Sequence, residues 1–435
     1  MTATVGQRRW IFIATAVVIF LVVIGAILTV AELVAEGLEA GNYPIYKNQA
    51  DATLGWLPKP GNYRYRATEY DTTSTINSLN MNDHEWTVED QKSPVRILAV
   101  GNSHTFAIGV STNQTWPKRV EAALFSSPRQ GVVMNAGVIG YNVGQYLLRY
   151  RLLREKIKPT VLLVGFSLAT DVYNLIPPER GGFIYGYDAD RVFFDIDSNG
   201  KLIERVYRKS ATAGSQKVVF NKASTNTIVN YLGQFALYRR LKRSSLAMTV
   251  ATYFHPGGNS FWPGMDTVLK KDLNAEDRYR WRLVELIIAK MATEAKANNT
   301  KIALVNIPYI AQVYDEVWAS SFGRRPNIYD RHIPSSRLKA ICDRYGVTFI
   351  DTTDAFVKAA RERKHWLHWR IDGHPTPEGQ QVIADVVAAN LKNTLPSEVP
   401  EVEVARPSST IHRHKRFSAK RSDFRPDHWT RKVRK

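Results

Sequence analysis

The sequence predicts an α/β protein built on a flavodoxin-like, doubly wound parallel sheet of five strands. Five short apolar runs have the length and composition of buried strands: residues 95–100, 131–138, 160–168, 301–308 and 347–351. Segments with helical spacing of apolar residues alternate with them: residues 115–125, 145–156, 276–297, 335–344 and 377–393. Because strands that alternate with helices form a parallel sheet covered on both faces, we expect one main domain at residues 94–395.

The composition is that of a globular protein, with 44% hydrophobic and 23% charged residues among 435. The single cysteine, Cys342, excludes an internal disulfide framework and a cysteine-rich metal site. The formal net charge is +19, but residues 406–435 contain eleven Lys or Arg and two Asp, which is roughly +9 of that charge. About half of the charge therefore lies in a C-terminal appendage, which says little about an active site, and a nucleic-acid partner is not indicated.

An N-terminal segment is long and apolar enough to cross a membrane. Residues 10–31 contain no charged side chain, and about 20 helical residues span the ~30 Å hydrocarbon core. Arg8 and Arg9 precede this segment, so the positive-inside rule keeps residues 1–9 in the cytoplasm and sends the rest across. A signal peptide has an apolar region of only about 7–15 residues, which favours an uncleaved, single-pass anchor in the cytoplasmic (inner) membrane. Small residues near Ala35 and Ala40 leave cleavage open as the alternative.

Three segments fall outside the alternating pattern. Residues 41–93 are predicted to form a stalk and entry segment, with Tyr63, Tyr65 and Tyr70 packing it onto the main body. The insert at about 178–270 is too long for a plain loop, and we expect it to fold as a lid or subdomain beside the site. Residues 396–435 are polar and basic without periodicity, which predicts a disordered tail.

Chemically competent residues follow the predicted strands at the edge where an open parallel sheet binds ligands. They are Ser103 after the first strand, a turn at 135–140 after the second, Thr170 after the third, and Asp372 with His374 after the fifth. Acyl transfer needs such a set: a nucleophile, a base oriented by a carboxylate, and hydrogen-bond donors for the oxyanion. The pattern therefore predicts a serine hydrolase site that requires no cofactor and no metal.

The chain resembles the SGNH hydrolases, also called GDSL-type esterases and lipases, of the membrane-anchored bacterial type. Residues 101–109 (GNSHTFAIG) are similar to the first motif of that family, Gly-Asp-Ser-x-Thr-x-Gly. Residues 135–140 (NAGVIG) are similar to its Asn- and Gly-containing turn, and residues 372–375 (DGHP) to its Asp just before His-Pro. Residues 54–60 (LGWLPKP) look like the entry segment of exported members. The resemblance covers about 50–395 and implies the SGNH hydrolase fold.

The resemblance also implies a role for each site residue. Ser103 would be the nucleophile, His374 the general base, and Asp372 the carboxylate that orients the base. The oxyanion hole would use the backbone N–H groups of Ser103 and Gly140 together with a side-chain donor from the third motif, where Thr170 stands.

Three positions depart from the family pattern. The family usually has Gly-Asn-Asp where residues 169–171 read ATD, so either Thr170 serves as a weaker donor, Asn174 replaces it, or the enzyme is slow. Asn102 stands where Asp is common, which we expect to alter hydrogen bonding in the loop more than the chemistry. Asp372 precedes the histidine by one residue fewer than the commoner Asp-x-x-His spacing.

Several histidines and tryptophans have competing interpretations. His104 diverges in direction from the adjacent serine, so we expect it to make a structural or substrate contact and not to act as the base. His365 and His368 have a spacing that suits a metal on a helix, but no third ligand is evident. Trp366 and Trp369 are expected to pack, or to stack on a sugar ring.

Together these features predict a membrane-anchored, extracytoplasmic serine esterase that acts on O-acyl, most simply O-acetyl, esters of a cell-envelope glycan or lipid. An O-acyltransferase on the same fold stays open, since the sequence does not decide between water and a sugar hydroxyl as acceptor. A catalytically weak glycan-binding or scaffold protein is a hypothesis of another class, motivated by Thr170. The basic tail at 396–435 is expected to contact an anionic lipid or glycan surface, and nucleic acid is the weaker alternative.

Overall fold

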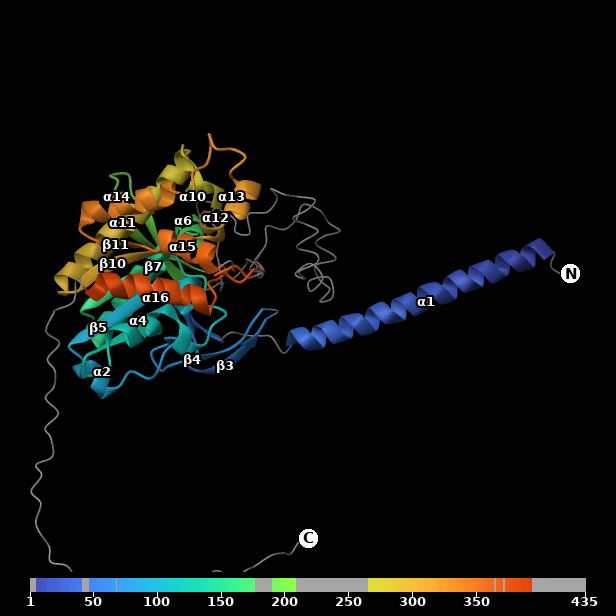
Figure 1. Ribbon diagram of the computed structural model, residues 1–435, viewed down its shortest axis with the longest axis horizontal. Coiled ribbons are helices and arrows are strands. Elements are labelled where there is room, and N and C mark those ends of the chain that lie inside the picture. Colours follow the sequence, from blue (N-terminus) through green and yellow to red (C-terminus); the bar gives the residue numbers. More distant parts are fainter. Residues whose placement is uncertain are drawn as a thin grey trace, which may run out of the picture. The chain divides into compact units, whose positions relative to one another are not determined.

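The structure is a computed structural model that describes residues 5–40, 47–67, 69–176, 190–208, 265–363, 365–370 and 372–392 (Figure 1). Most of the insert that the sequence predicts, residues 178–189 and 209–264, lies outside the described residues. The predicted basic tail, residues 396–435, also lies outside them.

A five-stranded parallel sheet forms the centre of the fold (Figure 1). Its strands lie in the order β11 (Thr348–Asp351), β10 (Lys301–Ile307), β7 (Val161–Ser167), β5 (Val95–Gly101) and β6 (Gly131–Asn135). All four neighbouring pairs are parallel. Counted along the chain from β5, this order is 2-1-3-4-5, the flavodoxin-like arrangement. The predicted fold class is therefore confirmed.

Helices cover both faces of the sheet. On one face α5 (Val143–Ile157), α11 (Ala275–Ala297) and α14 (Ile333–Tyr345) pack in succession, and on the other face α4 (Trp116–Leu124) packs against α16 (Pro377–Lys392). These five helices are the ones that the apolar spacing predicts, with ends that differ by a few residues. Other helices lie in the connections: α2 (Val88–Lys92), α3 (Ser103–Phe106), α6 (Leu168–Tyr173), α10 (Met265–Leu269), α12 (Ile310–Val313), α13 (Asp315–Ser321), α15 (Thr353–Arg363) and a 3₁₀ turn at Thr112–Gln114.

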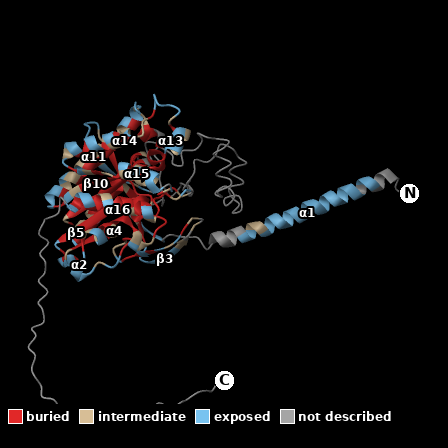
Figure 2. Cartoon of the chain, in the orientation of Figure 1, coloured by how far each residue is buried: buried red, intermediate tan, exposed pale blue. Residues whose placement is uncertain are grey.

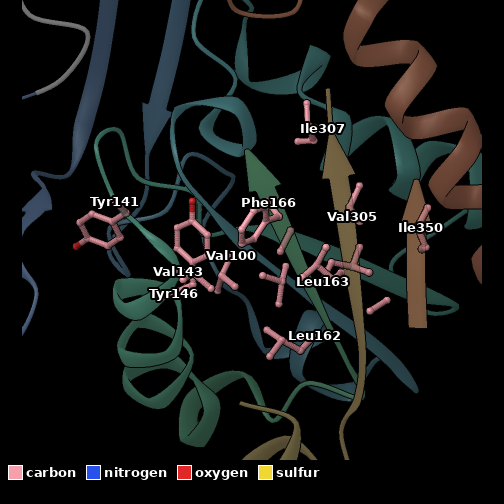
Figure 3. Close-up of a cluster of buried hydrophobic side chains, with 14 of the residues drawn as sticks. Val100, Tyr141, Val143, Tyr146, Leu162, Leu163, Phe166, Val305, Ile307 and Ile350 are labelled. Carbon is pink, nitrogen blue, oxygen red and sulfur yellow. The ribbon is translucent and has the colours of Figure 1, made fainter. Parts of the chain in front are cut away.

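The core consists of apolar side chains between the sheet and these helices. Figure 2 shows the buried residues concentrated in the sheet and on the inward faces of the helices. Val100, Leu163 and Val305 come from three adjacent strands, and they lie together in Figure 3 with Tyr146 of α5. Because parallel strands are covered on both sides, their apolar runs are continuous, which is why the sequence identifies them. The core fixes the carboxyl ends of the strands where the predicted site residues follow.

Three antiparallel hairpins that the sequence does not predict accompany the sheet. They are β1 (Asn48–Asp51) with β2 (Gly55–Pro58), β3 (Gly61–Arg66) with β4 (Asp71–Ile76), and β8 (Arg191–Ile196) with β9 (Leu202–Tyr207). The first joins the core directly: Trp56 is fully buried, and its carbonyl oxygen accepts a hydrogen bond from the Tyr141 hydroxyl. The described part of the entry segment is therefore built into the fold.

The N-terminal helix α1 (Val5–Ala40) contains a 23-residue apolar stretch, Phe12–Val34. By length and composition this stretch can cross a membrane, and a signal sequence would satisfy the same criterion. Its apolar side chains are exposed, for example Phe20 at 62% and Val22 at 65%. A lipid environment would remove this large apolar surface from water.

Candidate active site

Ser103, Asp372 and His374 meet beyond the carboxyl ends of the strands. Ser103 begins α3 directly after β5, whereas Asp372 and His374 lie in the loop before α16. Nε2 of His374 lies 2.7 Å from Oγ of Ser103, and Nδ1 of His374 lies 2.5 Å from Oδ1 of Asp372. Because a carboxylate only accepts, Nδ1 carries the ring hydrogen and Nε2 accepts the hydrogen of the Ser103 hydroxyl. This arrangement can activate a serine for nucleophilic attack.

The short spacing between Asp372 and His374 is accommodated by the glycine between them. Gly373 has φ of +86°, a backbone conformation that side-chain-bearing residues rarely adopt. The resulting tight turn lets Oδ1 of Asp372 accept both the ring Nδ1–H and the backbone N–H of His374, the latter at 3.2 Å. The Asp-x-His spacing therefore still brings the carboxylate to the imidazole.

The hairpin of β3 and β4 supplies two contacts to Asp372 that sequence reasoning missed. The Tyr70 hydroxyl donates to Oδ2 of Asp372 at 2.9 Å, and the backbone N–H of Asp372 donates to Oε2 of Glu69 at 2.9 Å. Burial alone would raise the pKa of Asp372, but the charge of His374 and the hydrogen bonds from His374 and Tyr70 outweigh burial and lower it. The carboxylate therefore stays ionised beside the histidine.

Two backbone N–H groups near the serine are without an acceptor. Among the residues that the structure describes, neither the N–H of Ser103 nor that of Gly140 donates a hydrogen bond within the chain. Gly140 has φ of +83° in the turn that follows β6, and the N–H of Val138 in that turn donates to the carbonyl of Gly101 at 2.9 Å. This hydrogen bond attaches the turn, which follows β6, to the end of the neighbouring strand β5. Two unused donors at adjacent strand ends suit a developing oxyanion.

Thr170 lies in the first turn of α6, and its Oγ1 is 2.6 Å from Nδ2 of Asn102, the residue before the serine. The next residue, Asp171, makes contacts within the fold. It is fully buried and accepts hydrogen bonds from the Tyr146 hydroxyl and from the backbone N–H of Ser167. Burial raises the pKa of Asp171 well above its usual range.

Asn174, the alternative donor, follows the last residue of α6. Its backbone carbonyl accepts a 2.8 Å hydrogen bond from Nδ2 of Asn142. Of the two candidates, Thr170 is the one that bonds to the residue preceding Ser103.

His104 and His368 lie near the site as buried, neutral rings. The His104 ring centroid is 4.6 Å from that of His374, and burial, followed by the proximity of His374, lowers the pKa of His104 well below its usual range. Nδ1 of His368 is 3.0 Å from the Tyr314 hydroxyl, and burial lowers the pKa of His368 to about 3. Neither histidine replaces His374 at the Ser103 hydroxyl.

Residues 365–370 form a loop, so the helix assumed for the His365 and His368 pair is wrong. The Tyr314 hydroxyl holds this loop by accepting the backbone N–H of Leu367 at 2.8 Å. Trp366 stacks on Tyr314, with ring centroids 4.2 Å apart and an interplanar angle of 11°. Within the described residues no group of three or more His, Cys, Asp and Glu side chains could hold a metal ion.

No protein-family model matches the sequence. No curated protein matches it either. Among solved structures, the chain is similar to the psychrotrophic esterase EstA from Pseudoalteromonas sp., with 13% identity, 69% of this chain and 97% of that chain covered, and a TM-score of 0.34.

The chain is also similar to two further solved structures. An acetylxylan esterase from Geobacillus stearothermophilus has 12% identity, with 69% of this chain and 94% of that chain covered, and a TM-score of 0.34. A GDSL-like lipase from Bacteroides thetaiotaomicron has 15% identity, with 71% and 92% covered, and a TM-score of 0.30. The chemistry of the site follows from its own geometry.

Proposed function

We propose that this protein is a serine esterase of the SGNH type that works through an acyl-serine intermediate. The observation that carries the proposal is the 2.7 Å contact between Nε2 of His374 and Oγ of Ser103, with Asp372 on the opposite nitrogen of the same ring. A serine that only caps a helix needs a hydroxyl and a backbone N–H. Ser103 is buried and hydrogen-bonds to a histidine that is paired with a carboxylate, which capping does not require.

The steps of the reaction follow from the proton positions. His374 takes the hydroxyl proton as Oγ of Ser103 attacks the ester carbonyl, and Asp372 stabilises the imidazolium that forms. The N–H groups of Ser103 and Gly140 and the Thr170 hydroxyl donate to the oxyanion. His374 then gives its proton to the departing alcohol, and an acyl-serine remains. Water, or a hydroxyl group of an acceptor, attacks this ester and regenerates Ser103, so esterase and O-acyltransferase use the same site.

The site of action follows from the apolar stretch in α1. We propose that α1 is an uncleaved, single-pass anchor in the cytoplasmic membrane, with the catalytic domain outside the cytoplasm. An ester hydrolase held there would meet O-acyl groups, most simply O-acetyl groups, on a cell-envelope glycan or lipid. The basic tail would add attraction to an anionic surface.

The first experiment compares the detergent-solubilised full-length protein with Ser103→Ala. The readouts are hydrolysis of p-nitrophenyl acetate and covalent labelling by a fluorophosphonate. Loss of both in the folded variant supports the acyl-serine mechanism. If the folded wild type shows no turnover and no labelling, the enzyme assignment is overturned. Glycan binding that survives Ser103→Ala would then indicate a binding protein.

A second experiment tests the anchor. A reporter that is active only outside the cytoplasm is fused after residue 395, and the membrane fraction is probed for the full-length chain. An active reporter on an intact, membrane-bound chain is expected. A shortened, soluble product would show that the apolar segment is a cleaved signal, and an inactive reporter would contradict the proposed orientation.

A further inference from the structure

Two residues that depart from the SGNH pattern contact one another. Asn102 replaces the common aspartate before the serine, and Thr170 replaces the common asparagine of the third motif. Nδ2 of Asn102 lies 2.6 Å from Oγ1 of Thr170, although the residues are 68 positions apart. Strands β5 and β7 are neighbours, with Gly101 opposite Gly165, so the segments that follow them emerge side by side. Each departure therefore lies in the environment of the other.

The polarity of this contact is fixed by a second hydrogen bond. Oδ1 of Asn102 accepts the backbone N–H of His104 at 2.9 Å, as the cap of α3. The amide group that faces Thr170 is consequently the NH₂ end, which can only donate. Thr170 must then accept through Oγ1, and its own hydroxyl hydrogen is directed to another group.

The described residues offer that hydrogen no acceptor. Thr170 makes no further side-chain hydrogen bond in the described part of the chain, although a threonine in a helix often donates to a carbonyl of the preceding turn. The N–H groups of Ser103 and Gly140 are unused in the same way, and all three donors follow the adjacent strands β5, β6 and β7. We expect an oxyanion bound beside Ser103 to accept from all three.

We propose that Asn102 is a positioning residue that turns the Thr170 hydroxyl into a donor for the oxyanion; this inference rests on the proposed esterase function. An aspartate at position 102 would reverse the polarity, because its carboxylate would accept the Thr170 hydrogen and withdraw it from the oxyanion. With Asp and Asn at these two positions the conflict would not arise, because one amide hydrogen could bond to the carboxylate and the second to the substrate. Asn102 and Thr170 thus form a matched pair with the polarity exchanged.

A double-mutant cycle on the detergent-solubilised full-length protein tests the pairing, with kcat and KM for p-nitrophenyl acetate as readouts. Thr170→Val is expected to lower kcat by about 100-fold with KM within about twofold, as for loss of one oxyanion donor. Thr170→Ser, which keeps the hydroxyl, is expected to recover most of that loss. Asn102→Asp is expected to lower kcat by about tenfold, and to change it less than twofold in the Thr170→Val background, because the donor it acts through is already gone.

A further variant restores the common pair. Asn102→Asp combined with Thr170→Asn is expected to be more active than Asn102→Asp alone, which a purely structural role for Asn102 would not produce. Should Asn102→Asp fail to fold, as judged by thermal unfolding, Asn102→Ala takes its place in the cycle with the same expected non-additivity.

Two results would overturn the inference. One is a set of losses in kcat that simply multiply in the double variant, and the other is full kcat in Thr170→Val. If either result is found while the wild type turns over substrate and is labelled by the fluorophosphonate, the pairing of Asn102 with Thr170 is wrong and the esterase assignment is unaffected. Absence of both turnover and labelling in the wild type would remove the two together.

Discussion

The Tyr70 hydroxyl donates a 2.9 Å hydrogen bond to Oδ2 of Asp372 across 302 positions of the sequence. Tyr70 lies directly before β4, and its ring also packs against Trp369, with centroids 5.3 Å apart. The other carboxylate oxygen of Asp372 receives His374, so both oxygens of this carboxylate are engaged. The entry segment therefore contributes to the candidate active site and is more than a connection to the anchor.

Tyr70→Phe is expected to lower kcat/KM by about 10–100-fold, because a hydrogen bond to a charged group contributes about 1.5–3 kcal/mol. Without this bond, the Asp372 carboxylate is less firmly oriented towards His374. Steady-state hydrolysis of p-nitrophenyl acetate measures the effect. Tyr63→Phe is the matched control, since the Tyr63 hydroxyl on the same hairpin donates to the carbonyl of Lys59 at 2.9 Å. Equal activities of the two variants would contradict the role given to Tyr70.

Asp372→Asn is expected to lower kcat by about 10²–10⁴-fold, since an uncharged amide neither holds the ring tautomer nor stabilises the imidazolium. Glu69→Gln serves for comparison, because Gln keeps an acceptor for the Asp372 backbone N–H that Glu69 binds at 2.9 Å. We expect its loss to stay below about tenfold. The rate of fluorophosphonate labelling reports on both variants, and similar losses in the two would show that Asp372 is not the orienting carboxylate.

The sheet and the placing of Ser103 and His374 at one site can be predicted from the sequence for a physical reason. A parallel strand buried on both faces is a continuous apolar run, as in β5 and β7, and a ligand site lies at the carboxyl ends of such strands. Ser103 and His374 could therefore be assigned to one edge of the sheet before their contact was seen. The order of the strands is determined by tertiary pairing, and the sequence predicted it through the general topology of alternating strands and helices.

The surroundings of the site depend on tertiary contacts that leave little trace in local sequence. Strand β4 reads DTTSTI, with only Ser74 and Ile76 buried, so its apolar signal is weak. Nothing near Tyr70 indicates a partner 302 positions away. The spacing of the histidines at 365–370 predicts a helix, whereas the Tyr314 hydroxyl holds the backbone of this loop in another conformation.

Gly140→Ala is expected to lower kcat by about 10–100-fold, because a φ of +83° is strained for alanine and the backbone would shift the N–H that we propose as an oxyanion donor. Gly200→Ala is the matched control: Gly200 has φ of +76° in the turn between β8 and β9, and an added Cβ meets nothing within 4 Å. Both variants should lose similar stability in thermal unfolding, whereas only Gly140→Ala should lose kcat. Full activity in Gly140→Ala would remove Gly140 from the oxyanion hole.

His368 predicts a pH dependence of stability whose sign follows from its lowered pKa. Burial lowers the pKa of His368 from 6.5 to about 3 in the folded protein, partly opposed by the carbonyl of Pro308. Between these values the unfolded chain binds a proton that the folded chain does not, so the free energy of unfolding falls as the pH decreases from about 6.5 towards 3. One such proton corresponds to about 1.4 kcal/mol per pH unit.

His368→Gln removes this titration, and the Gln side chain can still hydrogen-bond to the Tyr314 hydroxyl. Urea unfolding of the detergent-solubilised full-length protein at several pH values between 6 and 4 measures the slope of stability against pH. The wild-type slope should exceed that of the variant by about 1.4 kcal/mol per pH unit, whatever the other acidic and basic groups contribute to both. Parallel slopes would mean that His368 binds this proton equally well in the folded and the unfolded protein, which would contradict the lowered pKa.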